Sequence, residues 1–135
     1  MVDEKEILSK LVVQEKDAAK DLERLVEEAS KHFRIENPSG KVMFVDYAKL
    51  SDRQRIAALL TGTYFAYKLG LKGTFDLKIG DIAQEVGRPV TALSGPIKEL
   101  VKRGYVDYSA TDKKYRAAYH RVNDIVSGVL SDKKK

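Results

Sequence analysis

The stretch that decides the fold of this 135-residue chain runs from Ile79 to Val106 and reads IGDIAQEVGRPVTALSGPIKELVKRGYV. It predicts a short helix that ends at Gly87, since glycine tolerates the positive φ of a helix end. Pro89 stands where a second helix begins, a position that needs no backbone N–H. Apolar residues recur at helical spacing in both segments: Ile82, Ala83 and Val86 in the first, and Leu93, Ile97, Leu100 and Val101 in the second.

Strand-like segments flank these two helices. Residues 105–108 alternate in polarity, residues 110–113 are polar and suit a turn, and residues 114–118 suit a returning strand. The segment 74–79 is rich in β-forming residues and is expected to pair with this hairpin. The sequence therefore predicts two helices, a tight turn and a small antiparallel sheet.

The spacing of Ala83, Gly87 and Leu93 resembles that of the helix-turn-helix family, in which a small residue, a turn glycine and a plugging leucine let two helices cross closely. With the hairpin that follows, residues 50–120 resemble a winged helix domain, and the chain is similar to small, uncharacterised archaeal winged-helix proteins. The resemblance implies a mainly α fold with a small antiparallel β wing (α+β). It also implies that the second helix enters a DNA major groove, although winged helices also serve as protein-binding modules.

The chain is expected to divide into four parts. Residues 1–32 form a helical, coiled-coil-like arm, residues 33–49 a linking β-hairpin, residues 50–131 the winged helix domain with a C-terminal helix, and residues 132–135 a basic tail. Ser51 and Gln54 match a capping box that opens the helix to about Leu69. Its predicted buried stripe is Ile56, Leu59, Leu60, Thr63 and Tyr67, and that of the C-terminal helix is Val122, Ile125, Val126, Val129 and Leu130.

The arm carries an apolar stripe without Pro or Gly. Glu15 and His32 interrupt its two heptad core positions, so the coiled coil is imperfect. The residues expected to dimerise are Leu8, Leu11, Ala18, Leu22, Leu25 and Ala29. The alternative is that the arm packs along its own domain. We favour a homodimer, because a helix of this length, about 45 Å, exceeds what a small domain covers.

Charge and composition narrow the class of function. The net charge of +5 divides into −3 over residues 1–32 and +8 over residues 33–135, so the predicted domain is basic and suited to polyanions. The chain has no cysteine, which fits a cytoplasmic protein. Its acidic start, with Asp3, Glu4 and Glu6, does not suit a signal peptide. No apolar run approaches the ~20 residues that span a membrane.

Candidate DNA contacts lie on the second helix and the wing. Thr91 and Ser94 suit base edges, Val90 suits a thymine methyl, and lysines suit phosphates. The full set is Arg88, Val90, Thr91, Ser94, Lys98, Lys102, Lys113, Lys114, Arg116 and Arg121. A merely solvated helix face is the alternative. Gly95 and Pro96 depart from the usual pattern, because proline inside a helix should bend or loosen it.

No catalytic or metal constellation is visible. The two histidines, His32 and His120, lie far apart and neither belongs to a cluster with ligand spacing. No nucleophile has a base partner, so we expect a non-enzyme without cofactors. The favoured hypothesis is a dimeric protein that binds double-stranded DNA, as a transcriptional regulator or chromatin-associated factor. The alternative is a winged helix that binds protein within a larger assembly.

Overall fold

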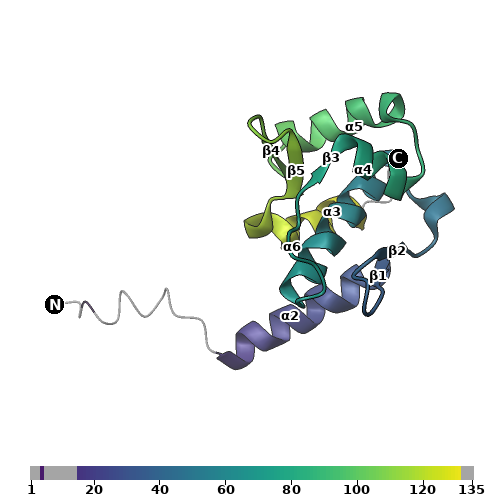
Figure 1. Cartoon of the computed structure of the whole chain (residues 1–135). Coiled ribbons are helices and arrows are strands. Elements are labelled where there is room, and N and C mark those ends of the chain that lie inside the picture. Colours follow the sequence, from purple (N-terminus) through teal and green to yellow (C-terminus); the bar gives the residue numbers. More distant parts are fainter. Residues whose placement is uncertain (1–3, 5–14, 132–135) are drawn as a thin grey trace.

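The structure, a computed structural model, describes residue 4 and residues 15–131, with side chains described at residue 4 and from Lys20 onward. It is a mixed α+β fold built around the central helix α3 (Asp52–Lys68), as Figure 1 shows. Elements from both ends of the chain contact α3: the strands β1 (Phe33–Ile35) and β2 (Val42–Phe44), the helices α4 (Ile79–Val86) and α5 (Val90–Lys102), the strand β5 (Lys114–Ala117) and the C-terminal helical segment. One helix thus supplies the surface on which the other elements assemble.

The middle of α3 is buried on all sides. All residues from Ile56 to Thr63 are buried, so this part of the helix has no solvent face. The predicted five-residue stripe was therefore too narrow, because Ala57, Ala58 and Thr61 are buried as well. It was also wrong at Tyr67, whose side chain is 40% exposed. A helix that is enclosed on all sides loses the amphipathic pattern on which such a prediction depends.

The predicted start of α3 is confirmed in its atomic contacts. The Ser51 hydroxyl accepts a hydrogen bond from the Gln54 N–H at 3.2 Å, and the Gln54 side-chain oxygen accepts one from the Ser51 N–H at 2.9 Å. This reciprocal capping box satisfies two N–H groups that the helix leaves without partners. Gly70 follows the helix at a φ of +79°, where a side chain would be strained.

Two helices follow α3 in the chain. The helix α4 (Ile79–Val86) ends at Gly87, whose φ is +77°, and α5 (Val90–Lys102) begins after Pro89. The predicted core residues are confirmed: Ile82, Val86, Leu93, Ile97 and Leu100 are buried, and Ala83 and Val101 pack against the core. Contrary to the expected loosening, α5 stays helical through Gly95 and Pro96.

The sheet beside these helices has the strand order β3–β5–β4 and is antiparallel throughout. Its strands are β3 (Leu77–Lys78), β4 (Val106–Ser109) and β5 (Lys114–Ala117), so the predicted hairpin and its third strand are both present. Tyr115 lies opposite Leu77 on one side and Tyr108 on the other. The register places the β4–β5 turn at residues 110–113, as the sequence predicted.

The N-terminal part consists of α2 (Glu15–Ala29) and the hairpin β1 (Phe33–Ile35) and β2 (Val42–Phe44), followed by the 3₁₀ turn η1 (Tyr47–Lys49). The linking hairpin is thus confirmed, and it packs on α3. Contact is close at Gly62 of α3, because a Cβ there would lie 2.7 Å from a Val42 methyl carbon and 3.1 Å from the Phe33 ring. Glycine at this position lets the hairpin approach the helix.

The C-terminal helical segment closes the core. It comprises the 3₁₀ turn η2 (Tyr119–Arg121), α6 (Val122–Asp124) and the π-helix η3 (Ile125–Leu130), and the five apolar residues of its predicted stripe are all buried. The sequence predicted an ordinary helix here and not the i→i+5 hydrogen bonds of a π-helix. The buried Gln54 amide donates to the carbonyls of Val129 and Leu130 at 3.1 and 3.4 Å, so a side chain of α3 satisfies the end of this segment.

The end of η3 meets the end of α2 at a small polar cluster. The Ser131 hydroxyl donates to the Glu28 carboxylate at 2.5 Å and lies 3.5 Å from His32 Nε2. This hydrogen bond is the main reason that the pKa of Glu28 lies below its usual range. Burial lowers the pKa of His32, an effect that the Glu28 charge opposes and the Lys31 charge assists.

This cluster predicts that acidification destabilises the fold. Because the folded state disfavours the protonated imidazole of His32, stability falls as the pH drops through the unfolded-state pKa of about 6.5 and levels off below the folded-state value. The Glu28 carboxylate, with its lowered pKa, stays ionised over this window. We expect the wild-type melting temperature to fall more between about pH 7.5 and about pH 5.5 than that of His32→Gln. An equal fall in the two proteins would contradict this assignment.

Candidate nucleic-acid interface

The helix α5 separates its apolar and polar faces as the sequence predicted. Leu93, Ile97 and Leu100 lie in the core. The opposite side presents exposed residues: Val90, Thr91, Ser94, Lys98 and Lys102. Val90 is 42% exposed, and the Ser94 hydroxyl donates to the Thr91 carbonyl at 3.3 Å. This face therefore offers two hydroxyl groups, one apolar side chain and two ammonium groups.

The β4–β5 hairpin lies beside α5, which contacts β4 (Figure 1). Lys113 stands at the hairpin turn with a φ of +56°, and its N–H donates to the Ser109 carbonyl at 2.7 Å. Lys113 and Arg116 are exposed, whereas Lys114 is half-buried. The predicted basic residues of the wing therefore stand on a strand pair that packs against the predicted recognition helix.

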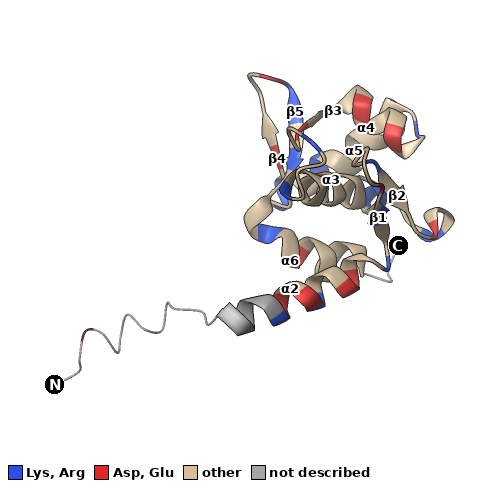
Figure 2. Cartoon of the chain, turned by 60° about the horizontal axis from the view of Figure 1, so that its bottom comes forward, with Lys and Arg blue, Asp and Glu red and all other residues tan. Residues whose placement is uncertain are grey.

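Charge is distributed unevenly among these elements. Figure 2 shows basic positions on β5 and acidic positions on α2 and α4. Asp76, which precedes β3, has a lowered pKa, chiefly because the Thr74 hydroxyl donates to it at 2.5 Å and further because Lys114 and Arg116 lie near. The Arg116 guanidinium also lies 5.9 Å from the centre of the Phe75 ring. Part of the positive charge of β5 is thus balanced within the fold.

Arg121 has an internal role that the sequence did not indicate. Its Nη1 donates to the Arg103 carbonyl at 2.6 Å, its Nε lies 3.3 Å from an Asp124 carboxylate oxygen, and its guanidinium lies 4.4 Å from the centre of the Tyr105 ring. The Arg103 carbonyl belongs to the C-terminal end of α5, where helix carbonyls lack intrahelical partners. Arg121 joins the end of α5 to the C-terminal segment, so this candidate DNA contact also has a structural role.

This role predicts that Arg121→Gln destabilises the protein. Loss of a charged hydrogen bond to a backbone carbonyl costs about 1–2 kcal/mol at a half-exposed position such as this one. We expect a matching decrease in the free energy of unfolding, measured by urea titration. Lys102→Gln, which also removes one positive charge, should change stability by less than about 0.5 kcal/mol. Equal effects of the two substitutions would refute the structural role.

Other arginines near α5 are also paired within the chain. Arg88 lies 3.3 Å from the Asp52 carboxylate, and one Glu99 oxygen lies 2.9 Å from Arg53 and 3.3 Å from Arg103. In contrast, Lys98, Lys102 and Lys113 form no ion pair with any residue in the described part of the chain. The lysines of the predicted interface are therefore available to a polyanion, as are exposed lysines elsewhere on the chain such as Lys41.

The predicted dimerisation residues differ in their exposure to solvent, and some of them lie outside the described residues. Leu22 is 56% exposed and Leu25 is half-buried against the core, while Ala29 is buried within its own chain. Ala29 is therefore unavailable to a partner, because α2 docks on the domain at this end. Leu8 and Leu11 lie outside the described residues, and only the helical backbone is described at Ala18. At its C-terminal end, the arm follows the alternative of packing along its own domain.

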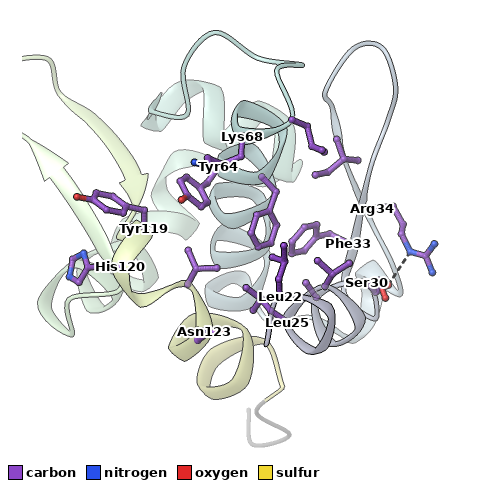
Figure 3. Close-up of a pocket in the computed structure, with 16 residues that line it drawn as sticks. Leu22, Leu25, Ser30, Phe33, Arg34, Tyr64, Lys68, Tyr119, His120 and Asn123 are labelled. Carbon is purple, nitrogen blue, oxygen red and sulfur yellow. Dashed lines mark hydrogen bonds between the residues drawn. The ribbon is translucent and has the colours of Figure 1, made fainter. Parts of the chain in front are cut away.

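Sequence reasoning missed an apolar groove of about 600 Å³ on the side of the molecule shown in Figure 3. The groove lies between α2, β1, the end of α3 and the C-terminal segment. Its walls include Leu22, Phe33, Tyr64 and Tyr119, with Arg34, Lys68 and His120 also lining it. These residues come from three separate parts of the chain, residues 22–35, 64–69 and 119–123, so no local pattern marks the groove.

Among the residues that the structure describes, no cluster of three or more His, Asp or Glu side chains could hold a metal ion. None of the described helices combines the length and apolar character needed to cross a bilayer. Comparison of the chain with protein-family models, curated proteins and solved structures found no match.

Proposed function

We propose that this chain is a winged helix protein that binds double-stranded DNA, with α5 in the major groove and the β4–β5 hairpin against the backbone. The observation that carries the proposal is that Lys98 and Lys102 of α5 and Lys113 of the neighbouring hairpin turn, none of which forms an ion pair within the described residues, lie on elements that pack together. Ammonium groups in this state are suited to phosphate oxygens.

The arrangement of elements supports the proposal. A short helix, a glycine turn and a second helix precede a hairpin that pairs with a strand from before the first helix. In winged helix domains this order presents the second helix and the hairpin to DNA. The overall charge agrees, because residues 33–135 carry a net charge of +8.

The mode of recognition follows from the side chains on α5. Its exposed face carries Thr91 and Ser94 but neither Arg nor Asn, the residues that most often read base edges by paired hydrogen bonds. We therefore propose that phosphate contacts supply most of the affinity. Limited sequence preference would come from Thr91 and from contact of Val90 with a thymine methyl group. A dimer built through the arm would present two such helices as a transcriptional regulator or chromatin-associated factor.

The test is the salt dependence of duplex binding. We expect wild-type affinity for a random duplex to fall steeply as salt rises, because each phosphate contact contributes a slope of about −0.9 to log affinity against log salt. Lys98→Glu and Lys113→Glu should each weaken binding to all sequences and reduce that slope by about one contact. Fluorescence anisotropy of a labelled duplex at several salt concentrations measures both quantities.

Lys41→Glu provides the matched control. Lys41 is exposed beside the β1–β2 hairpin, which lies away from α5 (Figure 1), and its reversal changes the net charge by the same amount. This variant should keep the wild-type slope. If all three variants weaken binding equally, the effect comes from net charge and the proposed interface is wrong. Absence of salt-dependent binding by the wild-type protein would favour the alternative, a winged helix that binds protein.

A further inference from the structure

We propose that the apolar groove beside α2 receives the N-terminal segment, residues 3–14, of a second copy of this chain. The inference rests on the dimer in the proposed function, but it does not depend on DNA binding. It assigns the place where the arm of one protomer contacts the domain of the other.

The groove has the surface expected of an interface. Leu22, Leu69 and Tyr119, which line it, are 56%, 66% and 58% exposed. Tyr64 forms part of the same wall, and its ring centre lies 5.8 Å from that of Phe65 and 6.4 Å from that of Tyr119 (Figure 3). Large apolar side chains that share one concave site favour an apolar occupant over solvent.

The sequence of the proposed occupant complements this surface. Residues 3–14 contain four apolar residues at positions that share one side of a helix: Ile7, Leu8, Leu11 and Val12. The segment is weakly acidic, because Asp3, Glu4 and Glu6 outnumber Lys5 and Lys10, while Arg34, Lys68 and His120 line the groove. Apolar contacts and opposite charges would therefore meet along the same path.

The direction of α2 favours a second copy over the chain's own segment. The groove adjoins the C-terminal half of α2, from Leu22 to Ser30, and Figure 1 shows the Glu15 end of this helix directed away from the domain. A helix continued from Glu15 toward residue 1 would extend about 21 Å farther from its own groove. An antiparallel arm from a second protomer runs in the reverse direction and brings its N-terminal segment toward the groove.

Disulfide trapping tests which chain fills the groove. The chain contains no cysteine, so two full-length variants with one cysteine each, Leu11→Cys and Leu69→Cys, can be mixed after one has been given a distinguishing tag. Mild oxidation should form the mixed dimer in preference to either like pair. Met43→Cys replaces Leu69→Cys as the control, because Met43 is 50% exposed on β2 and does not line the groove. Equal yields from the two mixtures would overturn the proposal.

A second measurement keeps the result independent of cysteine chemistry. We expect Leu69→Glu to weaken dimerisation at least about tenfold in sedimentation experiments, as loss of an interface anchor does, and Met43→Glu to leave it unchanged. A monomeric wild-type protein, or an internal disulfide in the Leu11→Cys/Leu69→Cys double variant, would overturn the assignment. Duplex binding measured on the same samples reports separately on the proposed function, because a monomer keeps α5 and the wing.

Discussion

Ile125→Ala is expected to lower the free energy of unfolding by about 2–5 kcal/mol. The Ile125 side chain is 1% exposed, in the segment η3 that packs against α3 and α2. Removing three carbon atoms loses their transfer free energy and leaves a cavity that the surrounding helices fill only in part. Urea titration followed by far-UV circular dichroism measures the loss.

Ser127→Ala is the control for Ile125→Ala, since Ser127 lies in the same helical segment but is exposed. Its hydroxyl donates only to the Asn123 carbonyl, at 2.8 Å. We expect its free energy of unfolding to change by less than about 0.5 kcal/mol. A loss at Ile125 as small as this would mean that the C-terminal segment does not belong to the core.

The second large effect is expected at Gly62→Val. A Cβ at Gly62 already lies 2.7 and 3.0 Å from the two Val42 methyl carbons, so a branched side chain must displace the β1–β2 hairpin or α3. Overpacking of this kind costs about 1–3 kcal/mol. That cost exceeds the improvement in helix propensity, which is at most about 1 kcal/mol. The expected result is a lower urea midpoint.

Gly80→Val tests whether the clash is responsible. Gly80 lies in α4, and a Cβ there meets no atom within 4 Å. The same substitution at this position should leave stability nearly unchanged, because only propensity terms remain. If Gly62→Val were as stable as Gly80→Val, the hairpin would tolerate displacement from α3, and close approach at Gly62 would not be needed for the fold.

Local patterns predicted much of this architecture. The stretch 79–106 carries two clear helical stripes, each bounded by glycine, and the structure places both helices within a residue or two of the expected limits. The strand pairing β3–β5–β4 also followed from local signals, because alternating segments separated by a polar turn have few other ways to pair. In these regions the residues that stabilise an element are close neighbours in sequence.

The predictions failed where tertiary contacts decide the outcome. The narrow stripe assigned to α3 was wrong because Ala57, Ala58 and Thr61 are buried by elements from both ends of the chain. Ala29 was assigned to a dimer seam, yet the docking of α2 on its own domain buries it. Heptad spacing indicates that a position is apolar, but it does not indicate whether a partner chain or the chain's own domain covers that position.

In the candidate site, too, the features set by local sequence were predicted and those set by tertiary contacts were not. The exposure of Thr91, Ser94 and Lys98 followed from helical periodicity. The internal use of Arg121 did not, because its partner carbonyl at Arg103 lies eighteen residues away and is reached only in the folded chain. The apolar groove was missed for a similar reason, since its walls come from separate segments that are brought together only by folding.

The enclosure of α3 has a consequence for the motions of the backbone. Helices on a protein surface exchange their amide hydrogens with solvent through small local openings, whereas a helix covered on every side exchanges only when its neighbours separate. The amides from Ile56 to Thr63 should therefore exchange at the rate set by global unfolding. Deuterium retained in this segment would report the stability of the whole domain, because the elements that cover α3 come from both ends of the chain.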